Sequence, residues 1–228
     1  MAVNYTLSML DAEGEARANI LALLAEYADE LKPGSSIAEL GCGNGRNLKI
    51  FKERGHQVLG VDGLAEAVEK CKSQGIPAEC LDFNGPLNLQ GSWDLVLILD
   101  VLEHLETPAH LLEKAKAMLS PGGRILVNVP NHFTLQGRIR ILLGSGIDSE
   151  RFFPSHPEWA YPHLRFFSHS GIKELAGEVG LAVVADKSKF FMRTPAVRLI
   201  PDRLIRALWG SLPVDLSVGG FFLELVEC

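Results

Sequence analysis

The sequence predicts an α/β protein, with a mostly parallel, doubly wound sheet covered by helices on both faces. Short apolar runs alternate with amphipathic stretches of helical length from residue 36 to residue 130, which is the pattern of repeated βαβ units. Residues 95–99 are apolar at every position, as expected for a central strand buried on both faces. Three glycines, Gly41, Gly43 and Gly45, directly follow the first apolar run, where a strand leads into a helix.

The predicted elements follow a regular order up to residue 130. A first helix is predicted over 14–31, because Ile20, Leu23, Leu24, Tyr27 and Leu31 fall on one face and Pro33-Gly34 ends the pattern. Strands are predicted at 36–40, 57–62, 77–81, 94–99 and 123–129, and helices at 45–54, 64–74 and 108–119. The segment Ser120-Pro121-Gly122-Gly123 is predicted to reverse the chain between the last of these helices and its strand.

The regular alternation stops after Asn131. Residues 132–167 combine prolines, histidines and aromatic residues, and we predict an irregular insertion with a helical piece near 134–143. A second insertion, 193–216, is predicted to contain a helix over 196–209. The remaining predicted elements are a helix over 170–179 capped by Ser168 and ended by Gly180, a strand over 181–192, and a last strand over 220–226.

Composition indicates one globular domain spanning 1–228, since 228 residues with 47% hydrophobic content suffice for a sizeable core. The formal net charge of −6 excludes a global basic field, so no nucleic-acid partner is expected. The four cysteines, Cys42, Cys71, Cys80 and Cys228, form no Cys-x-x-Cys motif and indicate free thiols. We find neither a signal-peptide pattern nor an apolar stretch of membrane-spanning length, and therefore expect a cytoplasmic protein.

The glycine run indicates an adenosine-containing ligand. Glycine lacks a Cβ, so a glycine turn between a strand and a helix lets bare backbone approach a ligand. The dinucleotide fingerprint Gly-x-Gly-x-x-Gly requires a further glycine one position later, where this chain has Arg46. The spacing Gly-x-Gly-x-Gly therefore points away from a nicotinamide cofactor and toward a different adenosine ligand.

Acidic residues end two further predicted strands. Asp62 closes the second strand, 21 residues after Gly41, where a carboxylate can accept hydrogen bonds from both ribose hydroxyls, or act as a turn residue. Asp82 follows the third strand and can bind an adenine amine with Phe83 over the ring, or simply end the strand. The stretch 100–104 adds titratable side chains just past the buried strand, at the edge where open α/β sheets bind ligands.

These motifs together resemble a class I S-adenosylmethionine-dependent methyltransferase. The resemblance covers about residues 36–130 and rests on motifs in the family's order: Glu39-Leu40-Gly41-Cys42-Gly43-Asn44-Gly45, Val61-Asp62, Leu81-Asp82-Phe83, Trp93-Asp94-Leu95-Val96, Asp100-Val101-Leu102-Glu103-His104 and Leu119-Ser120-Pro121-Gly122-Gly123. The stretches 100–104 and 163–167 are similar to the ubiquinone-type O-methyltransferases and to the methionine-biosynthesis W-type proteins with their relatives in polysaccharide gene clusters. The resemblance implies a Rossmann-like seven-stranded sheet, with five parallel strands and a reversed last strand.

The resemblance also implies roles for particular residues. The loop Gly41-Cys42-Gly43 would pass beneath the methionine part of S-adenosylmethionine, with Glu39 near its amino group. Residues 36–130 form the expected cofactor-binding core, and the insertions 132–167 and 193–216 form an acceptor site or lid. Asp62 would hold the ribose, Asp82 and Phe83 the adenine, and the backbone near Leu99 the methionine end. The full set of expected cofactor-binding residues is Glu39, Gly41, Cys42, Gly43, Asn44, Asp62, Gly63, Asp82, Phe83 and Leu99.

Two histidines are candidate catalytic residues. The cofactor carries the activated methyl group, so the protein has mainly to orient the acceptor, and a base helps when the nucleophile is a hydroxyl. His104 follows the central strand and His132 follows the neighbouring strand; the alternative is that His104 only packs against the cofactor or caps a turn. Glu103, His104 and His132 are also metal-ligand types, but adjacent Glu and His cannot face one point on a regular helix, so no metal is expected.

The resulting expectation is transfer of a methyl group to a small-molecule acceptor, at oxygen, with S-adenosylhomocysteine as product. The alternative is an S-adenosylmethionine-binding partner or regulatory protein of a biosynthetic pathway without robust turnover. The segment 156–165 is interpreted either as a lid or acceptor-site wall or as a packed surface loop. Arginines in the C-terminal half, at 138, 140, 193, 198, 203 and 206, leave open a peripheral membrane contact through 196–209.

Overall fold

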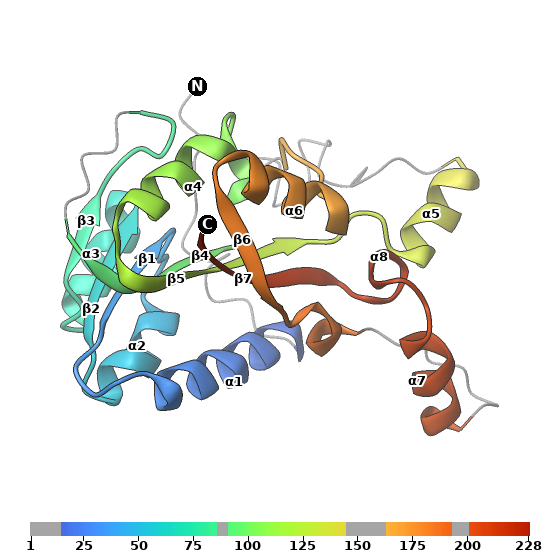
Figure 1. Cartoon of the computed structure of the whole chain (residues 1–228), viewed down its shortest axis with the longest axis horizontal. Coiled ribbons are helices and arrows are strands. Elements are labelled where there is room, and N and C mark those ends of the chain that lie inside the picture. Colours follow the sequence, from blue (N-terminus) through green and yellow to red (C-terminus); the bar gives the residue numbers. More distant parts are fainter. Residues whose placement is uncertain (1–14, 86–90, 145–162, 193–200) are drawn as a thin grey trace.

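A seven-stranded sheet runs through the middle of the protein in the order β3-β2-β1-β4-β5-β7-β6 (Figure 1). The computed structural model describes residues 15–85, 91–144, 163–192 and 201–228. The strands are β1 (Ser36–Leu40), β2 (Gln57–Asp62), β3 (Ala78–Cys80), β4 (Trp93–Leu99), β5 (Leu119–Pro130), β6 (Leu181–Asp186) and β7 (Gly220–Glu227). The first five pair in parallel, and β7 pairs antiparallel with both β5 and β6, which confirms the predicted sheet.

Helices cover both faces of this sheet, as predicted. One layer holds α1 (Glu15–Glu30), α2 (Arg46–Glu53) and α3 (Ala65–Ser73), and the opposite layer holds α4 (Pro108–Ala117) and α6 (His169–Glu178) (Figure 1). On β4, Leu95, Leu97 and Leu99 pack into the first layer while Val96 and Ile98 pack into the second. Every position of this strand core is therefore buried, which explains its unbroken apolar sequence.

The connection order creates a binding edge at the carboxyl ends of the strands. From β1 the chain continues to β2 and β3 on one side, and then crosses to β4 on the other side of β1. Open α/β sheets bind ligands in the crevice at such a switch point, because the loops after the two central strands separate there. The loops after β1 and β4 carry the glycine run and residues 100–104, so both candidate motifs lie at this edge.

Three predicted boundaries are wrong for local reasons. The reversal at 120–123 is a bulge within β5, because Trp93 pairs with Leu119 and Leu95 pairs with Arg124. The strand over 181–192 ends at Asp186, whose carboxylate accepts a hydrogen bond from the Ser188 amide at 3.0 Å and turns the chain into a 3₁₀ turn, η5 (Ser188–Phe191).

The helix over 196–209 begins only after a proline: α7 (Asp202–Gly210) has Pro201 as its N-cap, and residues 193–200 lie outside the described part of the chain. The helix predicted near 134–143 is α5 (Leu135–Leu142), and the helix capped by Ser168 is α6, with the Ser168 hydroxyl accepting from the Gly171 amide at 3.1 Å. Figure 1 shows α5 and α7 standing away from the two helical layers.

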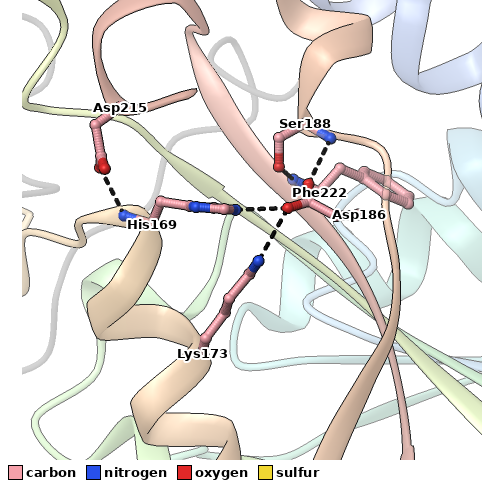
Figure 2. A network of polar contacts seen from close by, with 6 residues as sticks. All are labelled: His169, Lys173, Asp186, Ser188, Asp215 and Phe222. Atoms are coloured by element: carbon pink, nitrogen blue, oxygen red, sulfur yellow. Dashed lines mark hydrogen bonds and ion pairs between the residues drawn. The ribbon is translucent and has the colours of Figure 1, made fainter. Parts of the chain in front are cut away.

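A polar network fixes the end of β6 against α6 and α8 (Val214–Ser217) (Figure 2). Asp186 contacts His169 Nε2 at 2.6 Å and Lys173 Nζ at 3.1 Å, and the His169 amide donates to Asp215 at 2.7 Å. Burial opposes ionisation of Asp186, but hydrogen bonds from Ser188, His169 and Lys173 outweigh it and lower its pKa to about 2. The network therefore favours the ionised aspartate.

We expect Asp186→Asn to lower the free energy of unfolding by about 1 kcal/mol near pH 7, a value discounted for the partial exposure of the carboxylate. Because the folded-state pKa is depressed, this stabilisation is complete above the unfolded-state pKa of about 4 and is lost as the pH falls through about 2. Urea unfolding across that range measures it. Asp29→Asn, which removes the exposed ion pair with Arg54, is the control and should have a smaller effect; equal effects would contradict the network's role.

Candidate functional site

The glycine loop after β1 is a left-handed turn pinned to the end of β2. Gly41, Gly43 and Gly45 have φ values of 86°, 53° and 80°, which L-residues rarely adopt. The Gly41 and Cys42 amides both donate to the Val61 carbonyl, at 2.8 and 3.0 Å. Alternate glycines are therefore required by backbone conformation, and the sequence spacing predicted the loop correctly.

Asp62 ends β2 and faces this loop. Its Oδ2 accepts a hydrogen bond from the Gly43 amide at 2.8 Å, and its Oδ1 accepts one from the Leu64 amide at 2.9 Å. Burial raises the pKa of Asp62, and these backbone donors oppose that shift. Asp62 thus performs the turn role that the sequence left open, and each carboxylate oxygen keeps lone-pair capacity for a further donor.

The neighbouring residues of the predicted cofactor set line the same edge. Asn44 is buried and accepts a hydrogen bond from the Arg46 amide at 3.2 Å, while Gly63 continues the turn after Asp62. Asp82 is exposed, and its Oδ1 accepts from the Asn84 amide at 2.9 Å, so it ends β3 in a turn. Phe83 is half-buried against the core of the α4–α6 layer. The roles of Asp82 and Phe83 at an adenine stay predictions.

A buried acidic residue sits beneath the glycine loop. Glu39 is 1% exposed, and its Oε1 accepts a hydrogen bond from Asn47 Nδ2 at 2.6 Å. Burial raises the pKa of Glu39 to about 8, while Asn47 and the charge of Arg17 oppose the shift. The carboxyl group is therefore held close to its neutral form until a positive charge approaches.

Arg17 on α1 was missed in the sequence. Its charge acts on both Glu39 and Asp100, and its buried Nε has no hydrogen-bond partner among the described residues. A signal was present: Arg17 lies on the helix face that carries Ile20 and Leu24, three and seven residues further on. A cation on an apolar face is a candidate binding residue, since an unmatched buried charge is costly.

The end of β4 adds a strained acidic residue beside Leu99. Asp100 is the only non-glycine residue of the described chain with positive φ, at 57°. Its amide donates to the Asn128 carbonyl at 2.9 Å, and its Oδ1 accepts from Asn128 Nδ2 at 2.6 Å. Asp100 is exposed, but the protein atoms crowded around its carboxyl group raise its pKa, and Arg17 and Asn128 oppose the shift. Asn128, on β5 opposite Leu99, is a second residue that local sequence patterns did not identify.

Three histidines from separate segments meet beyond this strand end. The His104 and His163 rings are 4.9 Å apart, and the His132 and His163 rings are 4.8 Å apart. His132 Nε2 and His163 Nδ1 share a hydrogen bond of 2.6 Å. Phe166 packs edge-on against His132 with ring centroids 4.8 Å apart. The structure thus brings the two predicted histidines into one cluster through His163, which belongs to the segment 156–165 expected to be either a lid or acceptor-site wall or a packed surface loop.

Backbone hydrogen bonds hold His163 in position. The Leu164 and Arg165 amides donate to the Glu103 carbonyl at 2.7 and 3.0 Å, and the Arg165 guanidinium donates to the Glu106 carbonyl. These bonds clamp residues 163–165 onto the 3₁₀ turn η2 (Leu102–His104). Of the predicted lid segment 156–165, residues 156–162 lie outside the described part of the chain.

Glu103, His104 and His163 are the described residues with a metal-ligand arrangement, their ligand atoms lying within 4.8 Å of one another. Glu103 and His104 can face one point although they are adjacent, because η2 is a 3₁₀ turn and not the regular helix that the sequence prediction considered. However, His104 Nε2 and Glu103 Oε1 are 3.8 Å apart, whereas donors around zinc with bonds of about 2.0–2.1 Å lie roughly 3.4 Å apart. The set can hold a divalent cation only after contracting, and the absence of a metal stays a prediction.

The predicted arginines of the C-terminal half lie on two protruding helices. Arg138 and Arg140 are exposed on α5, Arg203 and Arg206 are exposed on α7, and positions 193 and 198 lie outside the described residues. Leu204 and Leu208 on α7 are 50% and 66% exposed. No described helix is long and apolar enough to cross a bilayer, and the peripheral membrane contact stays a prediction.

Known proteins share this architecture. Residues 12–186 match a family model described as a methyltransferase domain. The chain is 30% identical over 158 residues to probable tRNA methyltransferase 9B of Bos taurus, a match that covers 60% of this chain and 34% of that protein. It is 26% identical over 166 residues to ubiquinone biosynthesis O-methyltransferase of Burkholderia pseudomallei, covering 68% of each. Among solved structures, the chain is similar in fold to magnesium protoporphyrin IX methyltransferase from Synechocystis PCC 6803, which was crystallised with bound SAH. The TM-score is 0.60 and the sequence identity is 16%, and the match covers 95% of this chain and 90% of that one.

We expect Gly41→Ala to weaken S-adenosylhomocysteine binding at least about tenfold. An added Cβ would stand 2.3 Å from Val101 Cγ2, in addition to the roughly 1 kcal/mol penalty for a left-handed alanine. Gly122→Ala is the matched control, because Gly122 has φ 82° and no atom within 4 Å of the added Cβ. Calorimetric titration measures both affinities. Equal affinities for the two variants would contradict the role assigned to the loop.

Proposed function

This chain belongs to the methyltransferase-domain family that residues 12–186 match, with S-adenosylmethionine as methyl donor, and from that premise we propose that it methylates a hydroxyl oxygen of a small-molecule acceptor. The observation that carries the proposal is the cluster of His104, His163 and His132 beyond the end of β4. A sulfonium methyl group needs no further activation, whereas a hydroxyl acceptor benefits from a base that removes its proton. Three contacting imidazoles beside the strand end provide that base.

The residues around the glycine loop fit S-adenosylmethionine. Val101 packs so closely against Gly41 that this position has no room for a side chain. The Asp62 oxygens already accept hydrogen bonds from the Gly43 and Leu64 amides, and they can also accept hydrogen bonds from ribose hydroxyls. Glu39 has a pKa raised by burial to about 8, so an approaching ammonium group would favour its ionised form. Arg17, whose Nε atom is buried, is the complementary charge for the cofactor's carboxylate.

We assign the proton transfer to the histidine cluster. When bound, the cofactor supplies a methyl group on a positively charged sulfur, and transfer leaves a neutral thioether. His104 accepts the hydroxyl proton of the acceptor as the oxygen–methyl bond forms. The hydrogen bond between His163 and His132 holds the central ring in place, and the backbone clamp to Glu103 fixes its position relative to His104. The protein's part is thus to align the oxygen and hold one proton.

Two other functions make different demands. The bovine relative is named for tRNA, but this chain spans about a third of its length, and a net charge of −6 disfavours broad phosphate contact. A cofactor-binding partner without turnover would need no base, so the histidine cluster disfavours that role as well. The proposal therefore favours a small hydroxylated acceptor over RNA or a regulatory partner.

The test is formation of S-adenosylhomocysteine from S-adenosylmethionine with a panel of phenols, catechols, aliphatic alcohols, carboxylic acids, amines and tRNA. Product from a hydroxyl compound, with the added methyl located on oxygen by mass spectrometry, supports the proposal. Turnover only with amines or tRNA overturns the oxygen assignment. Cofactor binding without turnover across the panel favours the regulatory role. Activity lost in EDTA and restored by zinc or manganese contradicts the expectation that no metal takes part.

We expect His104→Ala to lower kcat with the identified acceptor by at least about a hundredfold, while changing S-adenosylhomocysteine affinity by less than about threefold. A base is needed for transfer but not for binding of the product. His110→Ala on α4, outside the histidine cluster, is the control and should leave both quantities unchanged. Parallel losses of turnover and affinity in His104→Ala would show that the ring only packs against the cofactor.

A further inference from the structure

Two of the four cysteines lie in contact beneath the glycine loop. The Sγ atoms of Cys42, in the loop, and Cys71, on α3, are 3.7 Å apart. Both side chains are buried, at 5% and 0% exposure. The other two cysteines, Cys80 and Cys228, are exposed. The 29-residue separation in sequence gave no indication of the pair, because only the packing of α3 against the loop brings the two thiols together.

The pair is connected to the carboxylate of Asp62 through one residue, Gly43. Cys71 Sγ donates a hydrogen bond to the Gly43 carbonyl at 3.3 Å, and the amide of the same residue donates to Asp62 at 2.8 Å. Cys42 belongs to the loop itself, one residue before Gly43. A change at either sulfur therefore acts on the backbone that positions Asp62 and the loop.

The surrounding backbone leaves the two sulfurs little room. A Cβ at Gly45 would stand 2.9 Å from Cys71 Sγ, and a Cβ at Gly60 would stand 2.7 Å from Cys42 Sγ. The hydrogen bond with Cys71 and burial raise the pKa of the Cys42 thiol, whereas the same hydrogen bond lowers the pKa of the Cys71 thiol. Because both side chains are buried, a small disulfide can reach them only when the loop moves.

We propose that Cys42 and Cys71 form a reversible disulfide that switches off S-adenosylmethionine binding. The oxidant is a low-molecular-weight disulfide: one cysteine thiolate attacks it, forms a mixed disulfide and releases one small thiol. The second cysteine then attacks the mixed disulfide and releases the other small thiol. Two protein thiols lose two protons and two electrons in total, and the small disulfide is reduced to two thiols.

Closing the disulfide changes the contacts that hold the present loop. The two sulfurs must approach by roughly 1.7 Å, from 3.7 Å to a bond length of about 2.05 Å. The Gly43 carbonyl also loses its Cys71 donor, since a disulfide carries no S–H. Both changes displace the loop from Asp62, so the oxidised protein binds the cofactor weakly. Bound cofactor in turn keeps the loop closed and slows the oxidation.

The experiment uses the full chain in glutathione buffers of increasing oxidised fraction, with and without S-adenosylhomocysteine. Free thiols are alkylated, the disulfide is located by peptide mass spectrometry, and S-adenosylhomocysteine affinity is measured by calorimetry. We expect a Cys42–Cys71 link in cofactor-free protein, an affinity loss of at least about tenfold that dithiothreitol reverses, and slower linkage with ligand present. No Cys42–Cys71 link, or a link without loss of affinity, overturns the proposal.

Variants separate this effect from general oxidation. Cys71→Ala and Cys71→Ser should each bind S-adenosylhomocysteine with the same affinity in reduced and oxidised buffer, whatever that affinity is. Two different substitutions are used so that the test survives if one of the variants fails to fold. The double variant Cys80→Ser and Cys228→Ser removes the exposed thiols and should respond like the original protein. If the double variant no longer responds, the exposed cysteines carry the effect. The reduced protein's affinity tests cofactor binding separately, so a failure of the switch is distinct from a failure of the site.

Discussion

The fold depends on the contact between the glycine loop and the end of β2. Three consecutive loop amides, those of Gly41, Cys42 and Gly43, donate to Val61 and Asp62 over distances of 2.8 to 3.0 Å. This contact requires left-handed backbone, which glycine adopts without steric penalty. Val101 packs against Gly41, so the position of the loop also determines where the chain turns after β4. The glycine loop and the turn after β4 are therefore parts of one packed unit.

The second half of the site is assembled by backbone hydrogen bonds across a long sequence separation. The Glu103 carbonyl accepts from the amides of Leu164 and Arg165, and Asn131 forms a bridge with Phe167. These contacts bring His163 to His104 and His132 without relying on flexible side chains. The chain segment between α5 and α6 thereby completes the histidine cluster to which we assign the base of the proposed reaction. The histidine cluster thus depends on contacts between this segment and the loops after β4 and β5.

Buried polar groups in this protein are matched in two different ways. Tyr27 on α1 donates to Glu224 on β7 at 2.7 Å, and Arg124 on β5 pairs with the same carboxylate at 2.9 Å, which ties the first helix to the sheet. Arg17 lies on the same face of α1, and its Nε donates no hydrogen bond among the described residues. Its positive charge instead lowers the pKa of Glu39 and of Asp100 at the carboxyl ends of the strands. The first set stabilises the fold, whereas the second leaves charge available to a ligand.

The sequence by itself determined the elements whose cause is local. Strand periodicity, the apolar run 95–99 and the left-handed glycines depend on residues near one another, so the sheet, the glycine turn after β1 and the place of Asp62 at the end of β2 were predicted correctly. The ligand contacts expected of these residues stay predictions. Only the tertiary structure decided which distant groups meet. Arg17, Asn128, His163 and the Cys42–Cys71 pair are joined to the site by contacts between elements that no local period encodes. Their positions follow from how helices and the late chain segment pack on the sheet, which is a property of the whole chain.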